Sequence, residues 1–333
     1  MTVQKLETLP PPPGVIGSLR AGFDVVANRV ALIFLPLGLD LLLWLGPRLN
    51  VSELFTPYVR LVLEQARLGV AESDLERFRQ VQSLLLETLQ DFNLLSLLSK
   101  LQLFPIGISS LSAQTLPAST PFGAPTVIVI SSFWIVLGLM AVLIPLGWIG
   151  GGVYFRQVAG SVLGGEGAGI GAANAVLQSL LLSFVWLIGM FLLFIPLTFG
   201  LGLLALISPS LANFALLVLM VLSFWLIVPL FFTPHGIFVR GENAFLSIYS
   251  SLRMTRFSFP TSGLFVLSAF LLSRGLDLLW SAPKSDQWLA LVGFAGHAFI
   301  TTVLLAASFI YYRDMTDWLK NAYERVRQFS QSS

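Results

Sequence analysis

The chain contains no cysteine and few charged residues, and both shortages limit what it can do. Without cysteine it can form no disulfide, no thiolate nucleophile and no cysteine-ligated metal site. Charged residues make up 11% of the 333 residues, against about 25% in soluble domains. The net charge of +2 is not gathered into a basic run, so nothing in the sequence indicates nucleic acid as a partner.

Motifs for catalysis or cofactor binding are also missing. The stretches 150–152 and 164–169 are rich in glycine, but they lack the Lys-Ser/Thr of a phosphate-binding loop and the strand that precedes a dinucleotide fingerprint. His235 and His297 are far apart and have no metal-ligand spacing. The Gly-x-Ser-x-Gly pattern of a nucleophile elbow does not occur. We therefore expect a noncatalytic protein with no cofactor and no metal site.

Apolar residues dominate the chain instead. Hydrophobic residues make up 56% of it, and the mean hydropathy is +0.83. About 20 apolar residues in a helix cross the hydrocarbon core of a bilayer, and six stretches approach or exceed that length. They lie at 27–46, 126–148, 175–204, 211–232, 263–280 and 288–311. The sequence thus predicts an all-α, polytopic membrane bundle of six spans.

The third and fourth spans come from one apolar run, 175–232, which is far too long for a single crossing. Ser208-Pro209-Ser210 supplies a break within it, because proline suits the first position of a new helix. We expect the two halves of the run to form a helical hairpin.

Lysine and arginine predict how the spans are oriented. Only Arg48, Arg60 and Lys284 lie close to a span on one side of this arrangement. The opposite side carries Lys5, Arg20, Arg29, Arg156, Arg240, Arg253, Arg256, Arg313, Lys320, Arg325 and Arg327. Since the more basic side of a membrane protein faces the cytoplasm, we expect a protein of the inner (cytoplasmic) membrane with both termini cytoplasmic.

These spans divide the chain into five parts. They are a cytoplasmic tail with an interfacial helix (1–25), the first span (26–47), an extracytoplasmic insertion (48–125), a five-span bundle (126–312) and a cytoplasmic amphipathic helix (313–333). In the last part Trp318, Leu319, Ala322, Val326 and Phe329 form an apolar stripe beside Lys320, Arg325 and Arg327. Such a helix is expected to lie on the cytoplasmic leaflet and contact anionic lipid, although a partner-docking helix has the same pattern.

The insertion is predicted to contain a helical hairpin. Apolar residues recur every three or four positions over 53–68 and again over 75–92. Ser73-Asp74-Leu75-Glu76 has the form of a capping box at the start of the second helix. The pair would serve either as a lid on the bundle or as a partner- or substrate-binding module. Residues 104–125 are expected to be an irregular connector back to the membrane.

A weak repeat precedes the first, third and fifth spans, where stretches of small and polar residues occur at 17–23, 171–177 and 243–249. It suggests three units, each an interfacial helix followed by a transmembrane hairpin. With Gly241-Glu242-Asn243-Ala244-Phe245-Leu246-Ser247 leading into Ser251-Leu252-Arg253, this organisation resembles poorly characterised bacterial six-span membrane proteins similar to the membrane domain of glycerophosphoryl diester phosphodiesterases. The resemblance covers most of the chain except 48–125.

The soluble catalytic domain of those phosphodiesterases carries a His-Arg motif and acidic metal ligands. Here His235 is followed by Gly236 and Ile237, and no acidic cluster accompanies it. The resemblance therefore implies no phosphodiesterase activity.

Four ionisable residues, Asp40, Arg274, Asp277 and His297, fall inside predicted spans. A charge at the bilayer centre costs about 2.5–3.5 kcal/mol on insertion scales, so these groups need partners. Arg274 and Asp277 share a helix face and are expected to pair, with Asp40 as a second carboxylate and His297 joining them. The group is either a structural network that joins the hairpins or an outer-leaflet cavity that binds a solute or lipid headgroup, or relays a proton.

Two functions follow from these patterns. The favoured one is a noncatalytic scaffold or assembly factor with a protein partner in the membrane or outside the cytoplasm. The alternative is a transporter, or a lipid- or solute-binding protein, built around the four buried residues.

Overall fold

The computed structural model describes residues 11–101, 104–117, 119–164 and 170–331. The first ten residues and the glycine-rich stretch 165–169 lie outside this part of the chain. In chain order the elements are α2 (Val15–Asn28), η1 (Val30–Ile33), α3 (Phe34–Leu45), β1 (Arg48–Asn50), α4 (Ser52–Arg67), η2 (Glu72–Asp74), α5 (Leu75–Asp91), η3 (Leu94–Leu98), α6 (Leu111–Thr115), β2 (Val127–Val129), α7 (Phe133–Val162), α8 (Ala172–Ile207), α9 (Pro209–Phe231), α10 (His235–Arg240), α11 (Ala244–Trp280) and α12 (Ala290–Gln331).

The predicted all-α membrane bundle is confirmed. Within the described residues, five helical segments are long and apolar enough to cross a membrane, and a sixth is added if α2 and the bent continuation Val30–Leu45 count as one span. That pair bends by 96° at Arg29, which lies just inside the predicted first span.

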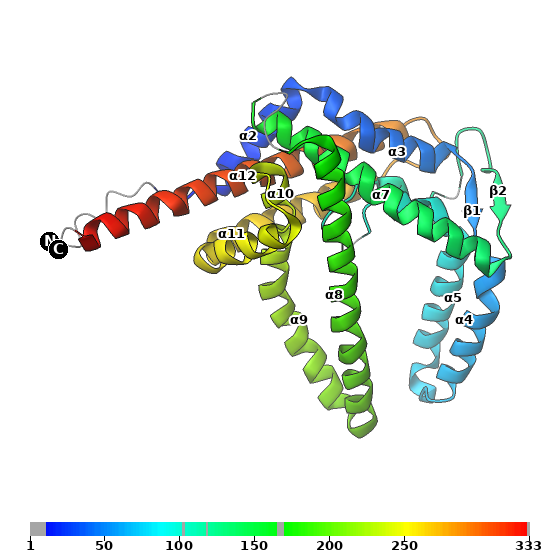
Figure 1. The fold of residues 1–333 in the computed structure, drawn as a ribbon. Helices are drawn as coiled ribbons and strands as arrows, with labels where there is room; N and C mark the ends of the chain where they lie inside the picture. Colours follow the sequence, from blue (N-terminus) through cyan, green and yellow to red (C-terminus); the bar gives the residue numbers. More distant parts are fainter. Residues whose placement is uncertain (1–10, 102–103, 118, 165–169, 332–333) are drawn as a thin grey trace.

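The break expected at Ser208 is also confirmed. The α8 helix ends at Ile207 and α9 begins at Pro209, while the Ser208 hydroxyl accepts a hydrogen bond from the Leu211 N–H at 3.4 Å. Figure 1 shows α8 and α9 side by side, extending away from the other helices. Their buried residues are confined to the attached ends: Ala175, Ser179, Leu182, Ser183, Val228 and Pro229. The remainder of this hairpin is apolar and exposed, as lipid contact requires.

The three-unit repeat is only partly visible. The α2 helix is a separate element, and α11 is kinked at Ser258, two residues before Pro260, whose ring removes a helical hydrogen bond. The α8 helix, in contrast, runs unbroken from Ala172, so the expected second interfacial helix is the first part of the span itself. The alanines at 172, 173 and 175 favour helix, and no proline interrupts them.

The C-terminal segment also differs from the expected separate helix. It continues α12, which runs from Ala290 to Gln331. Trp318 and Leu319 pack with Val15 and Leu19 of α2, so a neighbouring helix covers part of the predicted apolar stripe. The side chains of the stripe residues at 326 and 329 lie outside the described part of the structure.

The insertion is closed at its base by a short parallel ladder. Strand β1 pairs with β2, with Leu49 opposite Ile128, so the two ends of the insertion meet. The second span consequently begins at Phe133 and not at 126, because 127–129 belong to this ladder.

The predicted hairpin within the insertion is formed by α4 and α5, which pack on each other. The capping box is not formed, since Ser73 lies in the η2 turn and α5 begins without a side-chain cap. Leu54 and Phe55 near the base join a buried cluster with Val136 and Leu143 of α7. The far end of the hairpin extends away from the bundle (Figure 1), so it is not a lid.

The next part of the insertion, described over 94–101 and 104–115, packs against the bundle. Ile106 and Ile108 belong to the same buried core as Phe155 of α7 and Phe309 of α12. Glycine permits this approach, because a Cβ at Gly151 would lie 2.6 Å from the Cα of Gly107. The conformation is irregular as expected, but the segment is a structural part of the core. Its serines also form hydrogen bonds with polar residues of the spans.

Candidate functional site

Three of the ionisable residues predicted to lie inside spans are found near one end of the bundle. Asp40 lies five residues before the end of α3, Asp277 three residues before the end of α11, and His297 seven residues after the start of α12. The loop between α11 and α12 lies at this end. Helix α6 of the insertion packs against both α3 and α12 here.

Asp40 is fully buried and attaches the insertion to α3. Its Oδ1 accepts hydrogen bonds from the Ser110 hydroxyl at 2.6 Å and from the Ser112 N–H at 2.9 Å. The Ser112 hydroxyl donates in turn to the main-chain oxygen of Asp40 at 3.0 Å. Ser110 also caps α6 by accepting from the Ala113 N–H. Among the described residues, Oδ2 of Asp40 has no hydrogen-bond partner.

His297 is also fully buried, and it links α11 to the insertion. Its Nδ1 lies 2.7 Å from Oδ1 of Asp277, and its Nε2 lies 3.1 Å from the hydroxyl oxygen of Ser109. A carboxylate only accepts, so Nδ1 carries the proton in this contact and the Nε2 lone pair faces Ser109 in the neutral ring. Asp40 is close enough to His297 for their charges to interact. The structure thus brings three of the four predicted residues together.

Arg274 remains at the edge of this group. Its side chain is exposed, and its Nη1 donates to Oε1 of Gln114 at 3.4 Å. The expected pair between Arg274 and Asp277 is not seen, because Asp277 is turned toward His297. A long cationic side chain near the end of a span can extend to water, which removes the need for a buried partner.

The serines and the glutamine that complete the network were not predicted. Ser109, Ser110, Ser112 and Gln114 all fall in the stretch expected to be an irregular connector. Their concentration in a largely apolar chain was an available signal. Nothing in the sequence, however, indicated that this stretch enters the bundle and contacts α3, α11 and α12.

Aromatic residues close the network on the side of the α11–α12 loop. Trp44 is fully buried and donates from Nε1 to the main-chain oxygen of Ser285 at 2.9 Å. Its ring centre lies 5.0 Å from that of Phe294. A Cβ at Gly296 would lie 2.6 Å from the Trp280 ring, so the absence of a side chain at 296 lets that tryptophan pack flat against α12.

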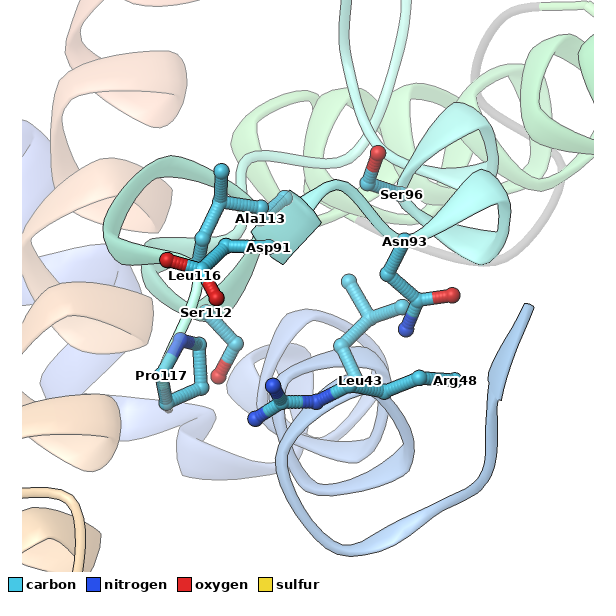
Figure 2. A pocket seen from close by; sticks show the side chains of 9 residues that line it. All are labelled: Leu43, Arg48, Asp91, Asn93, Ser96, Ser112, Ala113, Leu116 and Pro117. Carbon is cyan, nitrogen blue, oxygen red and sulfur yellow. The ribbon is translucent and has the colours of Figure 1, made fainter. Parts of the chain in front are cut away.

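A small cavity lies where Ser112 meets the base of the insertion (Figure 2). Its volume is about 10 Å³, which is roughly the room for one water molecule. Arg48 reaches across it, and desolvation lowers the pKa of this guanidinium while the nearby Asp91 carboxylate opposes the shift. The lining residues are Leu43, Arg48, Asp91, Asn93, Ser96, Ser112, Ala113, Leu116 and Pro117. The cavity is too small for a substrate.

Lys100 is a charged residue of the insertion, between η3 and α6. Its N–H donates to the main-chain oxygen of Ile108 at 2.7 Å, and its side chain interacts electrostatically with the buried His235. The side chain is accessible to solvent although many protein atoms surround it, and this desolvation lowers the pKa of the ammonium group.

The described residues contain no group of three or more His, Asp or Glu side chains that could hold a metal ion. Comparison with protein-family models, with curated proteins and with solved structures gave no match. The resemblance to the membrane domain of glycerophosphoryl diester phosphodiesterases therefore stays a prediction, as does the expected absence of catalysis.

Proposed function

We propose that this chain is a scaffold of the cytoplasmic membrane, with both termini cytoplasmic, that presents the α4–α5 hairpin to a protein partner outside the cytoplasm. The observation that carries the proposal is an apolar surface on a hairpin that extends away from the bundle. Tyr58, Leu61 and Val62 of α4 are 66%, 54% and 63% exposed. Apolar exposure of this density on one element commonly marks an interaction surface.

The hairpin is held rigidly where it joins the membrane bundle. The Asn93 side chain accepts from the N–H groups of Leu49 and Leu95, which ties the end of α5 to β1. The Asn50 side chain donates to the main-chain oxygen of Gln90 and accepts from Ser52, which ties the start of α4 to the end of α5. A fixed base lowers the entropy lost when the hairpin binds a partner.

The geometry gives less support to a transporter or a solute-binding protein. That function needs water or ligand to reach the buried ionisable group. Asp40 and His297 are fully buried, and protein groups occupy their hydrogen-bonding positions except for Oδ2 of Asp40. Their arrangement matches a network that fastens the insertion to the spans.

Lipid is proposed as a second partner at the opposite end of the bundle. Arg253, Arg256 and Lys320 are exposed there, near the cytoplasmic ends of α11 and α12 in the expected orientation. Each such cation gains about 1 kcal/mol from an anionic leaflet.

Site-specific photo-crosslinking in native membranes tests the scaffold proposal. A photoreactive residue at Leu61 should give a discrete protein adduct, and the same residue at Leu192, an exposed position of α8, should react with lipid. If Leu61 also reacts only with lipid, the hairpin lies on the bilayer and the proposal fails.

A further inference from the structure

Three side chains from three separate elements form a continuous hydrogen-bonded chain at the end of the bundle. Asp277 of α11 holds Nδ1 of His297 at 2.7 Å, and Nε2 of His297 lies 3.1 Å from the Ser109 hydroxyl. This is the order and spacing of a carboxylate, an orienting histidine and a serine nucleophile in hydrolases that are unrelated in fold. We propose that Ser109 is a nucleophile for acyl transfer, with His297 as its general base and Asp277 as a positioning residue.

The three residues of this chain differ in burial. His297 is fully buried, the Asp277 side chain is 14% exposed, and Ser109 is only half-buried. The base is thus shielded from water, while the residues on either side of it are partly exposed.

Main-chain donors are available beside the nucleophile. Among the described residues, the N–H groups of Ser109 and Ser110 have no hydrogen-bond acceptor. Serine hydrolases commonly stabilise the oxyanion with the N–H of the nucleophile or of the residue that follows it. Ser110 is itself fixed, because its hydroxyl bonds Asp40 and caps α6.

The position of Ser109 indicates the class of substrate. It lies near an end of the spans, where a lipid ester bond meets the bilayer surface. The exposed Arg274 lies one helical turn before Asp277 and contacts Gln114 of α6, so a cation lies at the edge of the group that includes the serine. We infer a carboxylic ester of an anionic phospholipid, whose phosphate can contact Arg274 while its acyl ester reaches Ser109.

The reaction balances with water as the only co-reactant. The Ser109 oxygen bonds to the acyl carbon and its proton passes to Nε2 of His297. The ester C–O bond breaks and the leaving alcohol takes that proton, which releases a lysophospholipid. Water then attacks the acyl-serine, gives a proton to His297 and releases the fatty acid as the Ser109 oxygen recovers its proton.

This inference goes beyond the proposed scaffold role, which needs neither Ser109 nor hydrolysis. A biotinylated fluorophosphonate tests it on the purified full chain in detergent micelles, with the labelled site located by peptide mass spectrometry. Labelling should occur at Ser109 and vanish in Ser109→Ala, while Ser99→Ala, which removes a hydroxyl from the same segment, should label normally. Absence of labelling in the folded wild type, or labelling elsewhere that survives Ser109→Ala, overturns the proposal.

Two further variants separate chemistry from folding. Asp277→Asn should slow labelling by about 10³–10⁴-fold and change its pH profile, because His297 would lose its fixed tautomer. Ser109→Cys should react with iodoacetamide faster than Ser99→Cys, with a rate that follows ionisation of the His297–Cys pair. Equal rates for the two cysteines would show that His297 does not activate position 109, whatever the stability of Ser109→Ala.

Release of fatty acid from phosphatidylglycerol, compared with phosphatidylcholine, tests the substrate class. The wild type should prefer the anionic lipid, and Arg274→Gln should remove the preference while retaining fluorophosphonate labelling. Equal rates for both lipids in the wild type would exclude recognition of an anionic headgroup.

Discussion

Ser112 donates two hydrogen bonds to Asp40, one to its side chain and one to its main chain. The Ser112 N–H donates to the Asp40 carboxylate at 2.9 Å, and the Ser112 hydroxyl donates to the main-chain oxygen of Asp40 at 3.0 Å. One residue belongs to a membrane helix and the other to the insertion, so this contact fixes the position of one relative to the other. Because the carboxylate is fully buried, losing its partners or removing it should be costly.

Replacing Asp40 by alanine should therefore destabilise the protein. The change leaves the Ser110 hydroxyl and the Ser112 N–H without their acceptor, at a cost of about 2–4 kcal/mol. Asp40→Asn retains an acceptor oxygen of the same shape and should cost much less. Thermal unfolding in detergent gives both values, and equal melting temperatures for the alanine variant and the wild type would contradict the anchoring role.

Close packing between α2 and α12 gives a second prediction. A Cβ at Gly22 would lie 2.7 Å from both the Cβ of Ala307 and the main-chain oxygen of Val303, whereas nothing lies within 4 Å of a Cβ at Gly17. Gly22→Ala should therefore cost about 1–3 kcal/mol through overpacking. Gly17→Ala, which has the same gain in helix propensity, should be neutral or stabilising. The difference between the two melting temperatures measures the destabilisation that overpacking causes at Gly22.

Lys100 predicts a pH dependence of stability. Desolvation lowers its pKa in the folded state, while the unfolded value is about 10.4. Between these two pKa values the unfolded state binds more protons, so the free energy of unfolding increases as pH rises. Below the folded pKa, the charged lysine destabilises the folded protein by the full cost of its desolvation. Lys100→Met should raise the melting temperature at about pH 7 and lose part of that advantage near pH 10.

The matched control is Lys284→Met, which alters an exposed lysine in the α11–α12 loop and should leave the melting temperature nearly unchanged. If Lys100→Met gives the same difference from wild type at both pH values, the lysine is not desolvated in the folded protein.

Orientation in the membrane can be measured directly because the chain has no native cysteine. A single cysteine at Glu64 of α4 should react with a membrane-impermeant maleimide in intact cells. A single cysteine at Asp317 of α12 should react only after permeabilisation. The reverse pattern would contradict cytoplasmic termini.

The sequence predicted the helical architecture well, because apolar length and the Ser208-Pro209 break are local signals. It also predicted the α4–α5 hairpin from helical periodicity. It failed where separate interfacial helices were expected next to spans. The stretch at 171–177 became part of α8, and the C-terminal segment became part of α12, since nothing in either stretch interrupts a helix.

The candidate site was only partly predictable. The cost of burying charge pointed to Asp40, Asp277 and His297, but it could not show that Asp277 would contact His297 in preference to Arg274. Ser109 gave no motif signal, because its partner His297 lies on α12, far along the chain. A noncatalytic protein was expected because catalytic motifs are missing. A serine and a histidine 188 residues apart form no recognisable sequence motif.

The insertion enters the core of the membrane bundle at Ile106 and Ile108, and the reactivity of Ile108→Cys tests this arrangement most directly. Ile108 is 5% exposed within the main core, whereas Glu64 is exposed on α4. In the folded protein, Ile108→Cys should resist a water-soluble maleimide that labels Glu64→Cys rapidly, and it should react after denaturation. Equal rates for the two cysteines in the folded protein would contradict this arrangement, and with it the anchoring of the insertion by Asp40.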